Sequence, residues 1–267
     1  MAIRFGCCLN MVAENEERTG TEHLEAAAEA GFSYVELPLA ELMVLPQRRI
    51  DEIRSQLRGS GIACETCNNF FPKNIRLTGS EVDNKAVMEY ASRALTLAGS
   101  LGVEHVVFGS GGAKNVPEGF PLEKGYEQVV KLLTALAPIA GDNGIVITIE
   151  PLRIQECNLI NTFAEGCRLA KDVGDERIKV LVDFYHLSVM QESPEVIVKY
   201  GREYLRHVHF ARTEGRSYPR YMEEDNYAPF IAALQKIGYD RRVSCEAYTK
   251  NFKEEAVAAL RFFRKNF

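Results

Sequence analysis

Hydrophobic positions along the chain fall into two patterns that alternate eight times. Short runs rich in Val, Ile and Phe, bounded by Gly, Asn, Asp or Pro, are typical of buried β-strands. Between these runs, apolar residues recur at spacings of three and four, which predicts amphipathic helices. The predicted strands cover residues 3–8, 34–37, 63–68, 105–108, 145–150, 178–183, 206–210 and 242–247. The predicted helices cover residues 22–30, 50–57, 85–98, 126–139, 162–173, 230–237 and 254–263, and one more begins at Ser193-Pro194-Glu195.

Eight strand–helix units in 267 residues predict an α/β fold, the (β/α)₈ TIM barrel. The competing doubly wound sheet would carry a Gly-rich phosphate-binding turn after its first strand. Here that turn reads Cys8-Leu-Asn-Met-Val12 and contains no glycine. Since no linker, low-complexity tract or further repeat interrupts the alternation, we expect one domain over residues 1–267.

Composition narrows the function classes. The chain is 46% hydrophobic and 26% charged, which is ordinary for a globular protein. Its 32 Lys and Arg against 37 Asp and Glu give a net charge of −5, which disfavours nucleic acid as a partner. No apolar run approaches the ~20 residues of a membrane helix, and the start MAIRFGCCLNM lacks the apolar block of a signal peptide. We therefore expect a cytoplasmic protein that contacts no membrane.

Seven scattered cysteines agree with a reducing compartment. Cys64-Glu-Thr-Cys67 fits a CxxC pattern, but no second pair completes a zinc ribbon. The pattern also lies within a predicted strand, away from a helix start where thiolates are activated. We interpret these cysteines as small core residues.

The last four predicted strands all end on polar side chains. Strand 145–150 ends on Glu150, strand 178–183 on Asp183, and strands 206–210 and 242–247 reach His209 and Glu246 near their ends. Active sites of TIM barrels lie at the carboxyl ends of the strands, so these four side chains are expected to converge at one mouth. Three neighbouring carboxylates repel one another unless a cation lies among them. A hard divalent ion with one nitrogen ligand suits this set, which predicts Mn²⁺, Mg²⁺ or Co²⁺.

The motifs around these residues resemble those of the sugar isomerase/epimerase family with a xylose-isomerase-like barrel. They are EPLRIQECNLINT at 150–162, VDFYH at 182–186, HVH at 207–209 and Cys245-Glu246. Within that family the ketose 3-epimerases, of the D-tagatose and D-allulose type, are the most similar.

The resemblance implies the role of each residue. Glu150, Asp183, His209 and Glu246 would hold one divalent metal, with Mn²⁺ preferred. Glu150 and Glu246 would also be the catalytic acid/base pair on opposite faces of a ketose.

Three further residues would bind the substrate. Glu156 and His186 match residues that contact ketose oxygens, and Arg216 matches a substrate-binding arginine. Arg216 lies one residue farther from His209 than the family pattern has it.

The chemistry follows from these parts. A metal that polarises the carbonyl makes the neighbouring C–H acidic by stabilising an enediolate. One glutamate removes the proton and the other returns one to the opposite face, which inverts the carbon. The sequence thus predicts a 3-epimerase for a free, unphosphorylated ketose. The family resemblance implies a homo-dimer or tetramer.

Two departures from the family pattern keep other functions open. The epimerases usually carry Asn-Arg where this chain has Arg153-Ile154, and the loop after Pro219 lacks the expected Gly-rich turn. A 1,2-aldose–ketose isomerase and a keto-inositol isomerase or dehydratase on the same metal site are the alternatives, followed by a catalytically silent sugar or metal binder. An apurinic endonuclease is disfavoured because the third and fourth strands end without histidine.

Two residues near the mouth receive structural interpretations. His207 is expected to be a buried, hydrogen-bonded residue of the barrel interior, with His209 the better ligand. Glu36 ends the second strand, and in its Tyr-Val-Glu-Leu run it is interpreted as structural.

Overall fold

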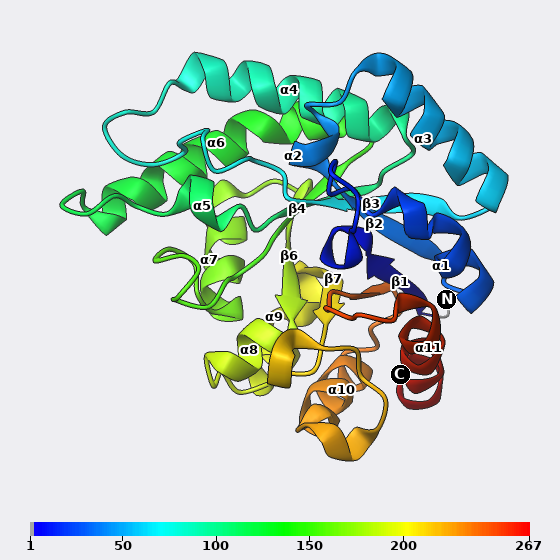
Figure 1. Ribbon diagram of the computed structural model, residues 1–267. Coiled ribbons are helices and arrows are strands. Elements are labelled where there is room, and N and C mark those ends of the chain that lie inside the picture. The colour runs from blue at the N-terminus through cyan, green and yellow to red at the C-terminus, as the bar shows by residue number, and fades with distance from the viewer. Residues whose placement is uncertain (1–2) are drawn as a thin grey trace.

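Eight parallel strands close into a barrel in the computed structural model, which describes residues 3–267. The strands are hydrogen-bonded in chain order from β1 to β8, and β8 pairs with β1 to close the ring. Helices follow the strands and surround the barrel on the outside (Figure 1). The predicted TIM barrel is confirmed.

The elements have the following bounds. The strands are β1 (Arg4–Cys8), β2 (Tyr34–Pro38), β3 (Ala63–Asn68), β4 (His105–Phe108), β5 (Val146–Ile149), β6 (Ile178–Asp183), β7 (Leu205–Phe210) and β8 (Arg242–Cys245). The helices are α1 (Leu24–Ala30), α2 (Leu39–Leu42), α3 (Gln47–Ser60), α4 (Asn84–Ser100), α5 (Gly111–Lys114), α6 (Leu122–Asp142), α7 (Phe163–Val173), α8 (Phe184–Val189), α9 (Glu195–Tyr204), α10 (Tyr227–Lys236) and α11 (Phe252–Asn266). Short 3₁₀ turns occupy Leu9–Val12, Thr21–His23, Glu214–Arg216 and Met222–Glu224.

Local sequence signals explain where the outer helices begin and end. Thr162 caps α7, because its side chain accepts the Glu165 N–H while the Glu165 carboxylate accepts the Thr162 N–H. Gly174 then ends α7 in the left-handed conformation, at φ 72°. The strands between the helices are buried on both faces, as parallel strands in a barrel are.

Strands β5 and β8 end earlier than the sequence predicts. The predicted ranges 145–150 and 242–247 include Glu150 and Glu246, which lie one residue beyond the observed strands. Their backbone N–H groups still donate to the neighbouring strands, Glu150 to Phe108 O at 3.2 Å and Glu246 to Phe210 O at 3.1 Å. Both side chains therefore leave from a fixed backbone at the carboxyl end of the barrel.

Short helices directly after β2, β4 and β6 were not predicted. These are α2, α5 and α8, of four to six residues each. Such short segments carry too little hydrophobic periodicity to be detected in the sequence. They matter here because α5 and α8 lie beside the candidate site.

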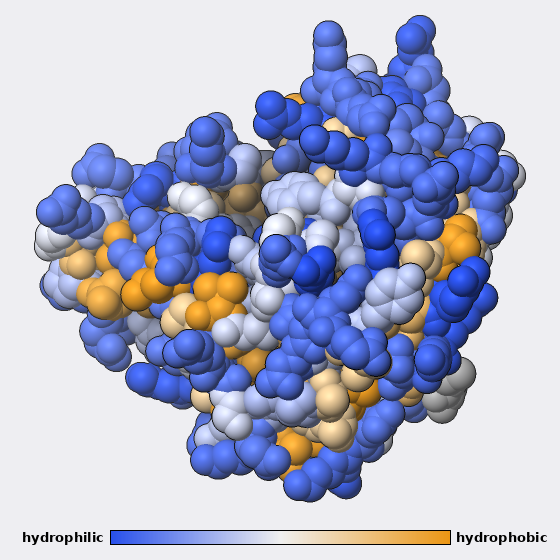
Figure 2. All heavy atoms as spheres, turned by 60° about the horizontal axis from the view of Figure 1, so that its bottom comes forward, coloured by the Kyte–Doolittle hydropathy of each residue, from blue (hydrophilic) through white to orange (hydrophobic). Residues whose placement is uncertain are grey.

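All seven cysteines are buried and unbridged, which confirms their interpretation as core residues. Among the described residues, no helix is long and apolar enough to cross a membrane. The face in Figure 2 is mainly hydrophilic, and its hydrophobic residues form small separate patches.

Candidate active site

The structure brings Glu150, Asp183, His209 and Glu246 together at the barrel mouth. Each of the four offers a ligand atom, and these atoms all lie within 4.8 Å of one another. All four residues are buried. His209 Nδ1 lies 3.1 Å from both Glu150 Oε1 and Glu246 Oε2. Neighbouring ligands of an octahedral ion with ~2.1 Å bonds are about 3 Å apart, so this donor set fits a hard divalent cation.

Burial and neighbouring charges raise the pKa of two carboxyl groups in this cluster and lower that of the third. Burial, helped by the charge of Glu246, raises the pKa of Glu150. Burial also raises the pKa of Asp183 to about 7, against the opposing charge of Arg216. Burial acts on Glu246 too, but the adjacent Arg216 and His209 outweigh it and lower the pKa of Glu246 to about 2. Such divergent values are typical of functional sites.

Arg216 lies directly on the carboxylate cluster. Its Nη2 donates to Asp183 Oδ2 at 3.2 Å and to Glu246 Oε2. The guanidinium carbon also lies 4.8 Å from the ring centroid of Tyr185, which fixes the direction of the side chain. Arg216 adopts a left-handed backbone conformation at φ 47°, next to Gly215 at φ 68°. The sequence predicted a substrate contact for Arg216 and did not predict these two ion pairs.

His186 presents one free ring nitrogen to the site. Its Nδ1 accepts the backbone N–H of Arg153 at 3.2 Å, which assigns the proton to Nε2. That buried Nε2 has no hydrogen-bond partner among the described residues. Burial, together with the charge of Arg216, lowers the pKa of His186 to about 3. A neutral imidazole with an unused N–H donor suits a ligand oxygen.

Glu156 lies at the edge of the same site. Its Oε2 is 4.0 Å from His186 Nε2, while its Oε1 accepts from Arg153 Nε at 2.7 Å. Arg153 also lies over the Tyr185 ring, 5.2 Å from its centroid. Arg153, which departs from the family pattern, therefore orients Glu156, a predicted substrate-binding residue.

A cavity of about 570 Å³ opens above these residues. Its lining includes Glu150, Glu246 and all three predicted substrate ligands, Glu156, His186 and Arg216. The volume suits a small organic substrate. Asp183 and His209, the other two members of the cluster, do not line this cavity.

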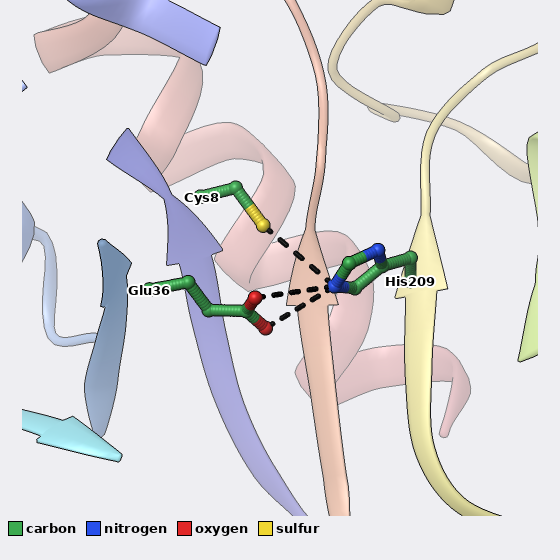
Figure 3. A group of neighbouring side chains, drawn as sticks. All are labelled: Cys8, Glu36 and His209. Carbon is green, nitrogen blue, oxygen red and sulfur yellow. Dashed lines mark hydrogen bonds and ion pairs between the residues drawn. The ribbon is translucent and has the colours of Figure 1, made fainter. Parts of the chain in front are cut away.

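Glu36, which the sequence analysis interpreted as structural, contacts the candidate ligand His209. Its carboxylate is fully buried and lies between two imidazoles: Oε1 is 2.5 Å from His207 Nε2, and Oε2 is 3.2 Å from His209 Nε2. Figure 3 shows this carboxylate and the Cys8 thiol both pointing at His209 Nε2, with the other ring nitrogen directed away. His207 is thus the buried, hydrogen-bonded residue that was predicted. Glu36 contacts His209 Nε2, the ring nitrogen that does not face Glu150 and Glu246. Carboxylates orient metal-binding histidines in this way.

The family description "Xylose isomerase-like TIM barrel" matches residues 24–266. The chain belongs to this family. Among characterised relatives, D-psicose 3-epimerase of Agrobacterium fabrum is 25% identical over 91% of each chain. The 2-oxo-tetronate isomerase of Cupriavidus necator is also 25% identical, over 91% of this chain and 92% of the relative. These relatives place the chain among carbohydrate epimerases and isomerases.

Solved structures agree on the fold. D-psicose 3-epimerase from Clostridium cellulolyticum H10, solved with D-tagatose, superposes with a TM-score of 0.87 at 21% identity and 99% coverage of both chains. The IOLI protein, solved with a zinc atom, superposes with a TM-score of 0.74 at 18% identity and 99% coverage of both chains.

Proposed function

We propose that the chain is a divalent-metal-dependent ketose 3-epimerase that acts on a free keto-sugar within one barrel domain. The observation that carries this proposal is the placement of Glu150 and Glu246. They follow β5 and β8, which are separated by β6 and β7 around the ring, yet both line one cavity and both belong to one ligand cluster.

The metal would be held by Glu150, Asp183, His209 and Glu246, and Mn²⁺ suits their oxygen-rich donor set. When bound, a divalent ion supplies Lewis-acid stabilisation of the negative charge that develops on the ketose oxygens. The surplus of carboxylates over cations in the cluster supports this assignment.

The protein's own groups would then move the protons. One glutamate removes the proton from C3, and the other donates a proton to the opposite face of the same carbon. For the reverse reaction the two roles exchange. His186 Nε2–H is placed to donate to a substrate oxygen, and Glu156 and Arg216 line the same cavity. These contacts orient the sugar so that C3 lies between the two carboxylates.

A 1,2-isomerase on the same site is the second candidate. It is supported by relatives named as isomerases, among them the 2-oxo-tetronate isomerase and a putative hydroxypyruvate isomerase of Drosophila melanogaster that is 22% identical over 96% of each chain. Arg153, which replaces the family's usual residue and pairs with Glu156, also changes the substrate-binding wall. Cytoplasmic location and assembly into a dimer or tetramer stay predictions.

Deuterium exchange followed by NMR tests the proposal. Mn²⁺-loaded and EDTA-treated protein is incubated in D₂O with a panel of free ketoses and keto-inositols. We expect label at C3 of a ketose with metal and none without it. Label at C1 or C2 would favour the 1,2-isomerase, and no label on any sugar would overturn both candidates.

A matched control separates catalysis from pocket damage. Glu41 lines the same cavity, outside the ligand cluster, and its carboxylate accepts from Asn69. Glu150→Gln should abolish detectable exchange, while Glu41→Gln should keep it within about fivefold of wild type, because general acid–base groups contribute about 10²–10⁴-fold. Equal losses in both variants would argue against the acid/base role of Glu150.

A further inference from the structure

The loop after β4 contains a buried lysine that none of the chemistry above uses. Lys114 closes the short helix α5 and is fully buried. Its Nζ donates to the backbone carbonyl of Gly109 and lies 3.3 Å from the backbone carbonyl of Glu150. No carboxylate of the described residues pairs with it, since both of its hydrogen bonds go to backbone oxygens.

These two carbonyls belong to the ends of neighbouring strands. The β4–β5 ladder pairs Phe108 with Ile149, and its last backbone bond runs from Glu150 N to Phe108 O at 3.2 Å. Gly109 and Glu150 are the next residues along, beyond the point where the ladder ends. The ammonium group of Lys114 therefore joins the two strand ends one step past the sheet. Burial lowers the pKa of Lys114, whereas Cys157, Glu150 and Glu156 act to raise it.

The backbone bends sharply to bring Lys114 back under the strand ends. Ser110, which precedes α5, adopts a left-handed conformation at φ 41°, costly for a residue other than glycine. The Ser110 hydroxyl accepts the Phe71 N–H at 3.0 Å, and the Lys114 N–H donates to Ser110 O at 3.0 Å. Such strain persists only where surrounding contacts hold it.

The loop held in this way packs against two residues of the candidate site. A Cβ added to Gly109 would lie 2.3 Å from Glu150 Oε2, so the Glu150 carboxylate rests directly on the Gly109 backbone. A Cβ added to Gly111 would lie 2.9 Å from the backbone oxygen of Glu156. Any shift of this loop would therefore move the Glu150 carboxylate and the segment that carries Glu156.

We propose that Lys114 is a positioning residue for Glu150: its ammonium group fixes both the backbone from which the Glu150 side chain extends and the surface on which its carboxylate lies. The expected effect on catalysis rests on the proposed function. The expected effect on the position of Glu150 rests on the geometry alone. Loss of the ammonium leaves two buried carbonyls unpaired, which releases the strand ends and the loop.

Lys114→Met tests this inference, because methionine fills similar space without N–H donors. The matched control is Lys179→Met. Lys179 is the second residue of β6, at the opposite end of that strand from Asp183. It is also buried, and its Nζ lies 2.8 Å from Glu176.

We expect Lys114→Met to weaken Mn²⁺ affinity about tenfold, measured by calorimetry, because Glu150 is no longer held in position to bind the ion. The same variant should lower kcat more than it changes KM. Lys179→Met should keep Mn²⁺ affinity within about twofold of wild type. Unchanged affinity in Lys114→Met, or equal losses in both variants, would overturn the inference.

A second variant and a second readout keep the test decisive. If Lys114→Met does not fold, Lys114→Gln replaces it, because its neutral side chain is one bond shorter and reaches at most one of the two carbonyls. At least threefold weaker Mn²⁺ binding is then expected, and wild-type affinity would refute the positioning role. A crystal structure of the variant needs neither metal nor ketose: the Glu150 carboxylate and Gly109 should be displaced, and unchanged positions would refute it as well. Absence of ketose exchange in the wild-type protein would sink the proposed function and leave this structural test intact.

Discussion

Buried carboxylates lie at both ends of the barrel, but their charges are matched differently. At the amino-terminal end Glu65 is held by Arg4 and by Arg242 Nε at 2.6 Å, and Arg242 also reaches Glu104 at 2.7 Å. Two acidic groups there meet two arginines. At the carboxyl end, three carboxylates and His209 meet one guanidinium, that of Arg216.

The pKa values reflect this difference. Burial alone would lower the pKa of Arg242, but the hydrogen bond and charge of Glu65 outweigh burial and raise it. That is the pattern of an ion network in which positive and negative charges are balanced. At the other end Asp183 has a pKa of about 7 and Glu246 one of about 2, although the two groups share Arg216. The unbalanced end is short of positive charge, which a divalent cation would supply.

The largest expected contrast comes from removing one carboxylate at each end. Glu246→Gln should lower the rate of C3 exchange by about 10³-fold, because it removes an acid/base group and a metal ligand together. Glu65→Gln should leave exchange within about threefold but reduce the free energy of unfolding by about 2 kcal/mol, since the largely buried Arg242 loses one of its two carboxylate partners and keeps Glu104. Exchange assays and urea unfolding of both variants measure the contrast. A Glu65→Gln variant as inactive as Glu246→Gln would remove the functional distinction between the two ends.

A smaller effect is expected from Glu36, which touches the cluster only through His209. Glu36→Gln should weaken Mn²⁺ affinity about 10- to 100-fold, because the amide no longer fixes the orientation of the imidazole as a carboxylate does. Cys8→Ala is the control: its Sγ lies 3.9 Å from the same His209 nitrogen, and its loss should change the affinity less than threefold. Calorimetric titration with Mn²⁺ compares them. The reverse order of effects would mean that the thiol is the important partner of His209.

The smallest expected effect is a gradual dependence of Mn²⁺ affinity on pH. The pKa of Asp183 in the metal-free protein is raised to about 7, so this group carries a proton below pH 7 that a metal must displace. Mn²⁺ affinity should therefore fall as the pH is lowered through 7, by about tenfold per pH unit for one displaced proton. Titrations in buffers of different ionisation enthalpy count that proton directly. A pH-independent affinity between 5.5 and 7.5 would show that Asp183 is already ionised.

Much of this site follows from the strand pattern. Glu150, Asp183, His209 and Glu246 were predicted together because each stands at the carboxyl end of a strand, and parallel strands bring those ends to one mouth. Glu156, His186 and Arg216 were expected near it from the resemblance to the family motifs, and all three line the cavity. It could not show that Arg216 pairs with Asp183 and Glu246, because that contact depends on the conformation of Gly215 and Arg216 in an irregular loop.

Glu36 and Lys114 show what the pattern leaves open. Glu36 stands in a strand whose five residues are all buried, so alternation does not tell which of them face the barrel interior. Its partners lie on β7, and β2 does not neighbour β7 in the ring, so they meet only because the barrel closes. Lys114 follows a Gly-rich loop, which has no hydrophobic periodicity from which the direction of its side chain could be predicted.

The sequence alone therefore determined the barrel and the four candidate metal ligands at its mouth, because these depend on periodicity and on where each strand ends. Only the tertiary structure decided which carboxylate faces which imidazole, where Arg216 lies and what Lys114 holds. Those contacts join segments far apart in the chain across the interior of a closed ring, and their geometry is set by packing.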